Sequence, residues 1–143
     1  MSRHYSLVGT EEYIAPETID DTDVSYASDL WSLGVITFQM LEGKTPFIGK
    51  TAIETFQNIS NLKGIEFKTT ADEFAKDFII NLLRTNPEER IGAKDIMEIK
   101  YHPFFKEINW ENVRFINPPF IPKDKKLRPQ RPPQLNLSFS DTN

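Results

Sequence analysis

The stretch ASDLWSLGVITFQML, residues 27–41, constrains the fold of this chain most strongly. Its apolar side chains surround most of a helical wheel, which is typical of a buried helix and not of a surface helix. Ser25 or Ser28 could cap its start, and Gly43 stands where a left-handed residue ends a helix. Residues 35–38 would also suit a strand, but the length and the terminal glycine favour a helix. We therefore predict one buried central helix.

Shorter helical patterns surround this stretch, and no convincing strand or internal repeat is present. One short helix is expected after Pro16. Residues 51–54 have capping-box spacing ahead of an apolar pattern, and residues 70–73 repeat that spacing ahead of a second apolar stripe. Asn86-Pro87 should end this second helix, because the residue before proline avoids helical angles. With a last short helix over 93–99, the predicted fold class is mainly α, around the central helix.

Composition argues against several classes of function. The chain has no cysteine and two histidines, which excludes disulfides and thiolate metal sites and disfavours zinc. It shows neither an apolar N-terminal run nor a stretch of membrane-spanning length, and we expect a cytoplasmic protein without a transmembrane segment. The net charge is −4, whereas residues 123–133 alone carry +4, so the rest carries −8. A nucleic-acid-binding role is therefore not expected.

The last part of the chain differs in character from the rest. Six of the ten prolines fall within residues 118–133. Because proline fixes φ and removes a hydrogen-bond donor, we expect an extended tail without a core of its own.

Four motifs now give the chain a family context: GTEEYIAPE, SDLWSLGV, PEER and HPFF, in this order. Together they resemble the C-terminal half of a eukaryotic protein kinase domain, and the resemblance covers essentially the whole chain. It implies a partial kinase domain over 1–105, which is the helical subdomain of the C-lobe. HPFFKEINWE followed by NPPFIP resembles the AGC group of kinases and implies an AGC-type tail over 106–143, extended or disordered. Within that group the motifs look most like the phosphoinositide-dependent type.

The resemblance implies roles for residues in SLVGTEEYIAPE. Ser6 matches a regulatory phosphorylation site, where a phosphate would add nearly two negative charges and order the loop. Thr10 matches the threonine that contacts the catalytic aspartate in Ser/Thr-specific members, and that aspartate is missing from this chain. Val8, Gly9, Thr10 and Tyr13 are implied in substrate binding. Without the resemblance, Ser6 is an ordinary exposed hydroxyl and Tyr13 an ordinary core aromatic.

Other matched positions are implied to be structural or to contact substrate. Glu17, the end of the APE motif, is expected to form a buried ion pair with Arg90. Asp29 and Trp31 belong to SDLW, and Asp29 resembles an acid that accepts hydrogen bonds from the catalytic loop. Without the resemblance, Asp29 is a helix-start charge. Gln39 stands where arginine-directed AGC kinases carry a glutamate, and its neutral amide disfavours a strong preference for arginine.

The expected activity is ATP-dependent phosphoryl transfer to serine or threonine of protein substrates, which include other AGC kinases in the phosphoinositide-dependent type. A complete kinase uses ATP and Mg²⁺, but this chain contains no G-x-G-x-x-G, HRD or DFG motif. We therefore expect no catalytic, cofactor-binding or metal-binding residue in it, and no activity without the missing N-lobe and catalytic loop. A truncated kinase is favoured. Alternatives are a non-catalytic docking module and a peptide ligand at Pro129-x-x-Pro132.

Overall fold

A computed structural model of the chain describes residues 11–22 and 24–120, and in these ranges it contains helices and no strand. The mainly α fold class is thereby confirmed. The described residues divide into a helical unit that ends at Ile108 and a second unit that starts at Asn109, and each is considered by itself. In the second unit, residues 109–120 form turns and bends. No helix in the described ranges is long and apolar enough to cross a lipid bilayer.

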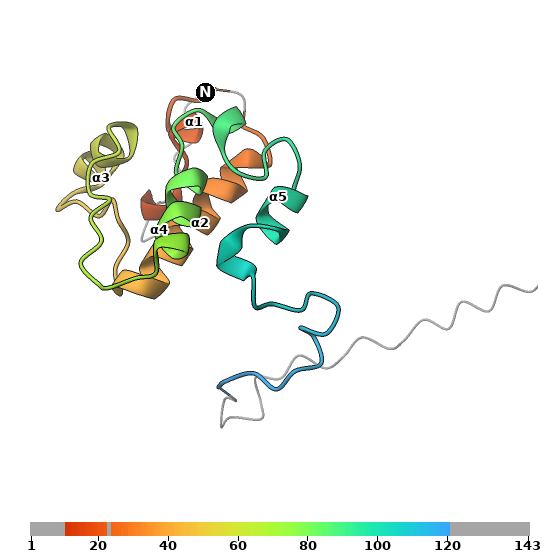
Figure 1. Ribbon diagram of the computed structural model, residues 1–143. Coiled ribbons are helices and arrows are strands. Elements are labelled where there is room, and N and C mark those ends of the chain that lie inside the picture. Colours follow the sequence, from red (N-terminus) through yellow and green to blue (C-terminus); the bar gives the residue numbers. More distant parts are fainter. Residues whose placement is uncertain (1–10, 23, 121–143) are drawn as a thin grey trace, which may run out of the picture. The chain divides into compact units, whose positions relative to one another are not determined.

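The helical unit is arranged around α2, Ala27–Glu42 (Figure 1). Before it come a 3₁₀ turn η1, Glu11–Tyr13, and the one-turn helix α1, Pro16–Ile19. After it come α3, Ala52–Ser60, and α4, Glu73–Leu82. The unit continues with η2, Pro87–Glu89, then α5, Met97–Lys100, and η3, Pro103–Phe105. Helix α4 packs directly beside α2 (Figure 1).

Helix α2 is the helix that the sequence predicted, and it contributes to both parts of the apolar core. Trp31, Val35 and Phe38 are fully buried in one cluster, and Leu30 lies in a second cluster with Phe78 of α4. Gly43 ends α2 with φ of 74°, as expected. The cap predicted at Ser25 or Ser28 is wrong, because the N-cap residue of α2 is Tyr26 and the helix has no side-chain cap. The Ser25 hydroxyl only accepts a hydrogen bond from the Ala27 amide, at 3.2 Å.

One part of the prediction for α2 is wrong. Leu33, Ile36 and Met40 are 36%, 38% and 79% exposed, so the helix is not covered on every side by the described residues. These residues recur at helical spacing and form one apolar face, which we call the open face of α2. Exposed apolar faces often mark surfaces that contact another part of a protein or a partner.

The crossing of α2 and α4 depends on Gly34. A Cβ atom at this position would lie 2.8 Å from Leu83 Cδ2 and 2.9 Å from Leu82 Cβ. Any larger residue would therefore push the helices apart, because core atoms cannot approach that closely. The stripe on α4 is buried along most of its length, with Phe78, Ile79, Leu82 and Leu83 nearly inaccessible.

The predicted helix boundaries were partly right. Thr51 Oγ1 accepts a hydrogen bond from the Glu54 amide at 3.2 Å, which confirms Thr51 as the cap of α3. The Glu54 carboxylate accepts from the Lys50 amide at 2.8 Å, so the second bond goes to the residue before the cap and not to Thr51 as in a regular capping box. The cap predicted at Thr70 is wrong, because α4 begins after Asp72 and has no side-chain cap.

The ends of the later helices also differ from the prediction. Helix α4 ends at Leu82, before Asn86-Pro87, and Asn86 caps η2 instead by accepting the Glu88 amide at 3.1 Å. The helix predicted over 93–99 is only one turn, Met97–Lys100. Local hydrogen bonds of Asn, Asp and similar side chains compete with helix formation, and the Met97 amide indeed bonds to Asp95 Oδ1 at 2.9 Å.

Candidate functional site

The candidate site is the segment 11–17 and the part of α2 against which it lies. Of the residues predicted to contact substrate or to be modified, Ser6, Val8, Gly9 and Thr10 lie outside the described residues. Their roles stay predictions. The remaining predicted residues are described, and all except Asp29 fall into two groups, one around Arg90 and one around Gln39.

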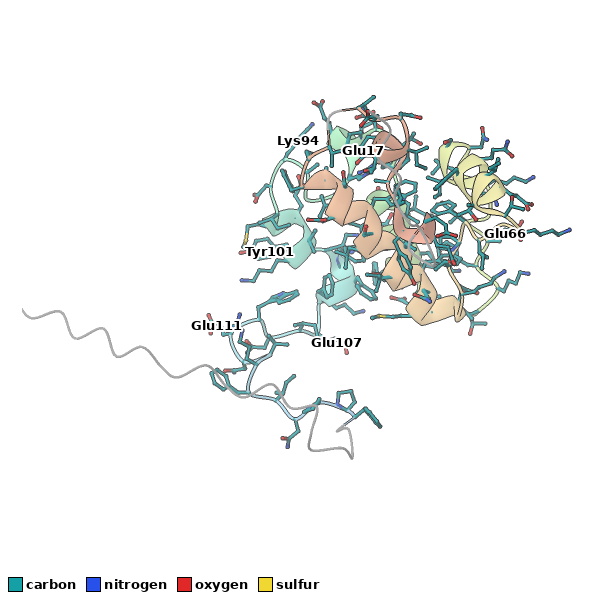
Figure 2. The ribbon with its side chains drawn as sticks, turned by 180° about the vertical axis from the view of Figure 1, so that it is seen from behind. Glu17, Glu66, Lys94, Tyr101, Glu107 and Glu111 are labelled. Atoms are coloured by element: carbon teal, nitrogen blue, oxygen red, sulfur yellow. The ribbon has the colours of Figure 1, made fainter. Side chains whose placement is uncertain are left out.

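The first group is the predicted ion pair between Glu17 and Arg90, and it is present. Arg90 Nη1 lies 2.7 Å from Glu17 Oε1, and Arg90 Nη2 lies 2.7 Å from Glu17 Oε2, so the two planar groups meet in a bidentate arrangement. Both residues are buried, with 2% and 6% of their surface exposed for Arg90 and Glu17. Figure 2 labels Glu17 on the helical unit.

Arg90 also organises the backbone around it. Its Nη1 group donates to the Ala27 carbonyl at 2.7 Å, Nε to Arg84 at 2.9 Å, and Nη2 to Thr85 at 3.3 Å. With the two bonds to Glu17, all five N–H donors of the guanidinium have acceptors. One side chain thus joins the start of α2, the loop after α4 and the helix α1 that carries Glu17.

The carboxylate of Glu17 is held in its charged form. Burial raises the pKa of this carboxyl, but hydrogen bonds from Arg90, the backbone and the Ser28 hydroxyl, together with the charge of Arg90, outweigh burial and lower the pKa below its usual value. The Ser28 bond, to Oε1, is 2.8 Å long. The ion pair is therefore present at neutral pH.

Trp31 packs against the ion pair. Arg90 Cζ lies 5.2 Å from the centre of the Trp31 ring, within the range of a cation–π contact, and the ring stacks on Phe47 at 5.2 Å. The structural role predicted for Trp31 thereby has a physical basis in packing. Its Nε1 group is buried and has no hydrogen-bond partner among the described residues.

The second group connects Tyr13 to α2. The Tyr13 hydroxyl donates to Gln39 Oε1 at 2.8 Å, and the Ser32 hydroxyl donates to the Tyr13 carbonyl at 2.9 Å. Next to them Thr45 donates from its hydroxyl to the carboxylate of Glu12. The segment 11–17 is therefore attached to α2 and the following loop by side-chain hydrogen bonds as well as by the ion pair.

Sequence reasoning missed the contacts of Ser28 with Glu17 and of Ser32 with Tyr13, although a signal was available. Ser28, Ser32 and Gln39 are separated by four and seven residues, so they lie on one side of α2. A polar row of this kind on an otherwise apolar helix indicates a polar partner. Asp29, in contrast, is exposed near the start of α2, and no described residue donates a hydrogen bond to its carboxylate.

The residues present were also compared with the needs of ATP and Mg²⁺. Residues 11–22 and 24–120 contain no group of three or more His, Cys, Asp or Glu side chains that could hold a metal ion. Magnesium in kinases needs carboxylate and amide ligands beside the phosphates. The described part of the chain therefore does not fit a Mg²⁺ site, and no chemical step is assigned to the metal.

Comparison with known proteins gives the family. The model of the protein kinase domain family matches residues 1–105, which is most of the chain. The chain belongs to the protein kinase domain family. Among similar proteins, this kinase chain is 44% identical over 120 residues to the serine/threonine-protein kinase cek1 of Schizosaccharomyces pombe, covering 82% of the chain and 9% of that protein.

Two further relatives cover more of this kinase chain. It is 37% identical over 134 residues to the probable serine/threonine-protein kinase pdkA of Dictyostelium discoideum, covering 89% of the chain and 19% of pdkA. It is 38% identical over 140 residues to the protein kinase PINOID 2 of Oryza sativa subsp. japonica, covering 91% of the chain and 28% of PINOID 2. The kinase chain thus spans less than a third of each of these relatives.

Proposed function

We propose that this chain is the C-lobe portion of an ATP-dependent protein serine/threonine kinase, in which it holds the substrate-binding segment in place. The observation that carries the proposal is the attachment of residues 11–17 to the helical unit, through Glu17 and Arg90 at one end and Tyr13 and Gln39 at the other. A segment that must present a peptide needs such a rigid support, because misplacement by about 1 Å can slow a reaction about 100-fold.

The open face of α2 is consistent with a further part of a kinase domain packing against this chain. Leu33, Ile36 and Met40 form an exposed apolar surface, and the Asp29 carboxylate near the start of the same helix has no described donor. The missing N-lobe and catalytic loop of a kinase domain would supply an apolar cover and backbone N–H donors. In our proposal these missing parts also hold ATP and Mg²⁺, and this chain alone does not transfer phosphate.

The subgroup and regulation are further parts of the proposal. The motif order and the neutral Gln39 support an AGC kinase of the phosphoinositide-dependent type, whose substrates include other AGC kinases, acting in the cytoplasm. Ser6 is the proposed regulatory phosphorylation site, and Val8, Gly9, Thr10 and Tyr13 are the proposed peptide contacts. Thr10 would orient the missing catalytic aspartate. Residues 106–143 are the proposed AGC-type tail, and 1–105 the partial kinase domain.

A complete kinase domain tests the activity. The part of the cek1 kinase domain that precedes its matched segment would be joined to this chain, and transfer of labelled phosphate from ATP to serine, threonine and tyrosine peptides would be measured. We expect phosphorylation of serine or threonine peptides by the joined domain and none by the 143-residue chain alone. Phosphorylation of tyrosine peptides only would contradict the proposal.

The same experiment addresses the second candidate, a non-catalytic substrate-docking module. The open face and the attached segment 11–17 would serve such a module equally well. A joined domain that binds peptides but transfers no phosphate, while cek1 itself does, would favour the docking module. Sequencing the transcript upstream of Met1 for in-frame HRD and DFG motifs gives an independent answer.

A further inference from the structure

A small hollow lies between the start of α2, η2 and the loop that follows η2. It has a volume of about 220 Å³, and most of the residues that line it are apolar or aromatic: Tyr26, Ala27, Pro87 and Ala93, with Ser25 and Glu88 beside them. Hydrogen bonds hold its walls, because the Tyr26 hydroxyl donates to the Ala93 carbonyl and Arg90 Nη1 donates to the Ala27 carbonyl at 2.7 Å. The hollow is therefore preformed. It is smaller than the pockets of about 300–1,000 Å³ that hold small-molecule ligands, and it suits one side chain.

A second hollow, of about 340 Å³, adjoins the first, and Glu88 lines both of them. The charged residues that line this second hollow are Glu88, Glu89, Glu98, Lys94 and Arg90. The charge of Arg90 is already compensated by Glu17, so the three glutamates and the lysine leave a net negative charge. Glu88 is exposed, and no described residue donates a hydrogen bond to its carboxylate or forms an ion pair with it. The second hollow is therefore acidic, and the carboxylate at its junction with the first is available to a partner.

We propose that the two hollows form one docking groove for a segment of a partner protein that carries an apolar side chain next to arginine or lysine. The apolar side chain would occupy the hollow at Tyr26, and the basic residues would pair with Glu88 and Glu89. Arginine suits this position well, because its guanidinium can bind a carboxylate through two parallel hydrogen bonds. The docking groove lies outside segment 11–17, so the inference does not rest on the proposed function.

Other classes of ligand fit the docking groove less well. The glutamates do not form a metal site, since no group of three or more His, Cys, Asp or Glu side chains in the described ranges could hold an ion. Nucleic acids and anionic lipid surfaces attract basic protein surfaces, whereas this groove is acidic. A small organic cation would leave the apolar hollow empty. A peptide segment with both chemistries matches the two neighbouring hollows.

Peptide binding to the full 143-residue chain tests the inference. The probes are the fluorescein-labelled peptides Gly-Ser-Leu-Arg-Arg-Ser-Gly and Gly-Ser-Arg-Arg-Leu-Ser-Gly, which place the leucine on either side of the arginines, and binding is measured by fluorescence anisotropy. At least one peptide should bind, and its affinity should fall as the salt concentration rises, because ions screen exposed charges. Replacing its leucine by alanine should weaken binding about tenfold, since less apolar surface is buried.

Variants of the chain locate the bound peptide. Glu88→Gln removes a negative charge and should weaken binding about 2–5-fold, whereas Lys94→Gln removes the opposing positive charge and should strengthen binding by about the same factor. Glu66→Gln is the matched control, because Glu66 is also exposed and Figure 2 shows it on the opposite side of the helical unit from Lys94. The control should leave the affinity unchanged. Tyr26→Ala, with its fold verified by circular dichroism, should abolish the advantage of the leucine peptide over the alanine peptide.

Several outcomes would overturn the inference. If neither peptide binds, or if the alanine peptide binds as tightly as the leucine peptide, the docking groove is wrong. Equal losses in Glu88→Gln and Glu66→Gln would mean that the peptide is attracted by the acidic chain in general. If the peptides do not bind but the chain self-associates in sedimentation experiments, and Glu88→Gln abolishes this, a second copy of the chain occupies the groove instead. None of these measurements involves phosphate transfer or segment 11–17, so their failure leaves the proposed function untouched.

Discussion

Replacing Glu17 by glutamine tests the energetic basis of the site most directly. Glutamine keeps the shape of glutamate but removes its charge, and its NH₂ group would point a donor at a guanidinium donor. Arg90 would then remain 2% exposed with only neutral oxygens around its charge. The variant therefore measures the cost of an uncompensated buried cation.

The magnitude follows from the geometry. Removal of one partner from a buried ion pair costs about 3–5 kcal/mol, and the lower end would apply only if water reached Arg90. Whole domains of this size are stable by about 5–15 kcal/mol, so Glu17→Gln should remove a large part of the free energy of unfolding. Replacing both Glu17 and Arg90 by methionine should cost less than the sum of the single changes, because no buried charge is left.

The assay is urea denaturation at pH 7, followed by far-ultraviolet circular dichroism, with the wild type and variants under the same conditions. Glu73→Gln is the matched control. Its carboxylate lies 2.7 Å from Lys76 Nζ, the same separation as in the buried pair, but the Glu73 side chain is 85% exposed. An exposed pair contributes about 0–1 kcal/mol, and the control should change the unfolding free energy by no more than that.

The result that refutes the reasoning is equal behaviour of the two variants. If Glu17→Gln lowers the unfolding free energy by less than about 1 kcal/mol, as the exposed control does, the buried pair contributes no more than a surface pair. The bidentate geometry would then have no energetic meaning, and the support for segment 11–17 would have to come from Tyr13 and its neighbours.

Three further predictions concern the same unit. The pKa of Glu17 is lowered on folding, so the charged carboxylate contributes fully to stability at neutral pH. This contribution is lost as the pH falls below about 4, the usual range of a free glutamate. In acid unfolding, Glu17→Gln should lack the loss of stability that comes from protonating Glu17. Gly34→Ala should lower stability by about 1–3 kcal/mol in thermal unfolding, since the new Cβ meets Leu83 at 2.8 Å. Thr51→Ala should cost about 0.5–2 kcal/mol, and Thr70→Ala, which removes no cap, should cost almost nothing.

Local patterns predicted those features that depend on neighbouring residues. The cap at Thr51 and the end of α2 at Gly43 are set within a few residues, and both were predicted correctly. Thr70 has the same spacing to Glu73 as Thr51 to Glu54, yet it does not cap α4. Spacing permits a cap without enforcing it, because tertiary packing of the apolar stripe decides where the helix begins.

The site was predictable only where the resemblance supplied long-range pairing. Glu17 and Arg90 are 73 residues apart, and no local rule connects them. The three backbone carbonyls that Arg90 contacts could not be foreseen, because their positions depend on how the loop after α4 meets the start of α2. The bond from Tyr13 to Gln39 required the same kind of knowledge.

The open face of α2 shows why the central helix was predicted to be more buried than it is. The sequence pattern shows that apolar residues surround most of the helix, but it does not show which other residues cover each side. Leu33, Ile36 and Met40 are only partly covered by the described residues, and buried Trp31 Nε1 has no described partner. Exposing apolar side chains to water costs free energy, and so does burying a donor without a hydrogen-bond acceptor. In our proposal, the N-lobe and catalytic loop of a complete kinase domain would cover these side chains.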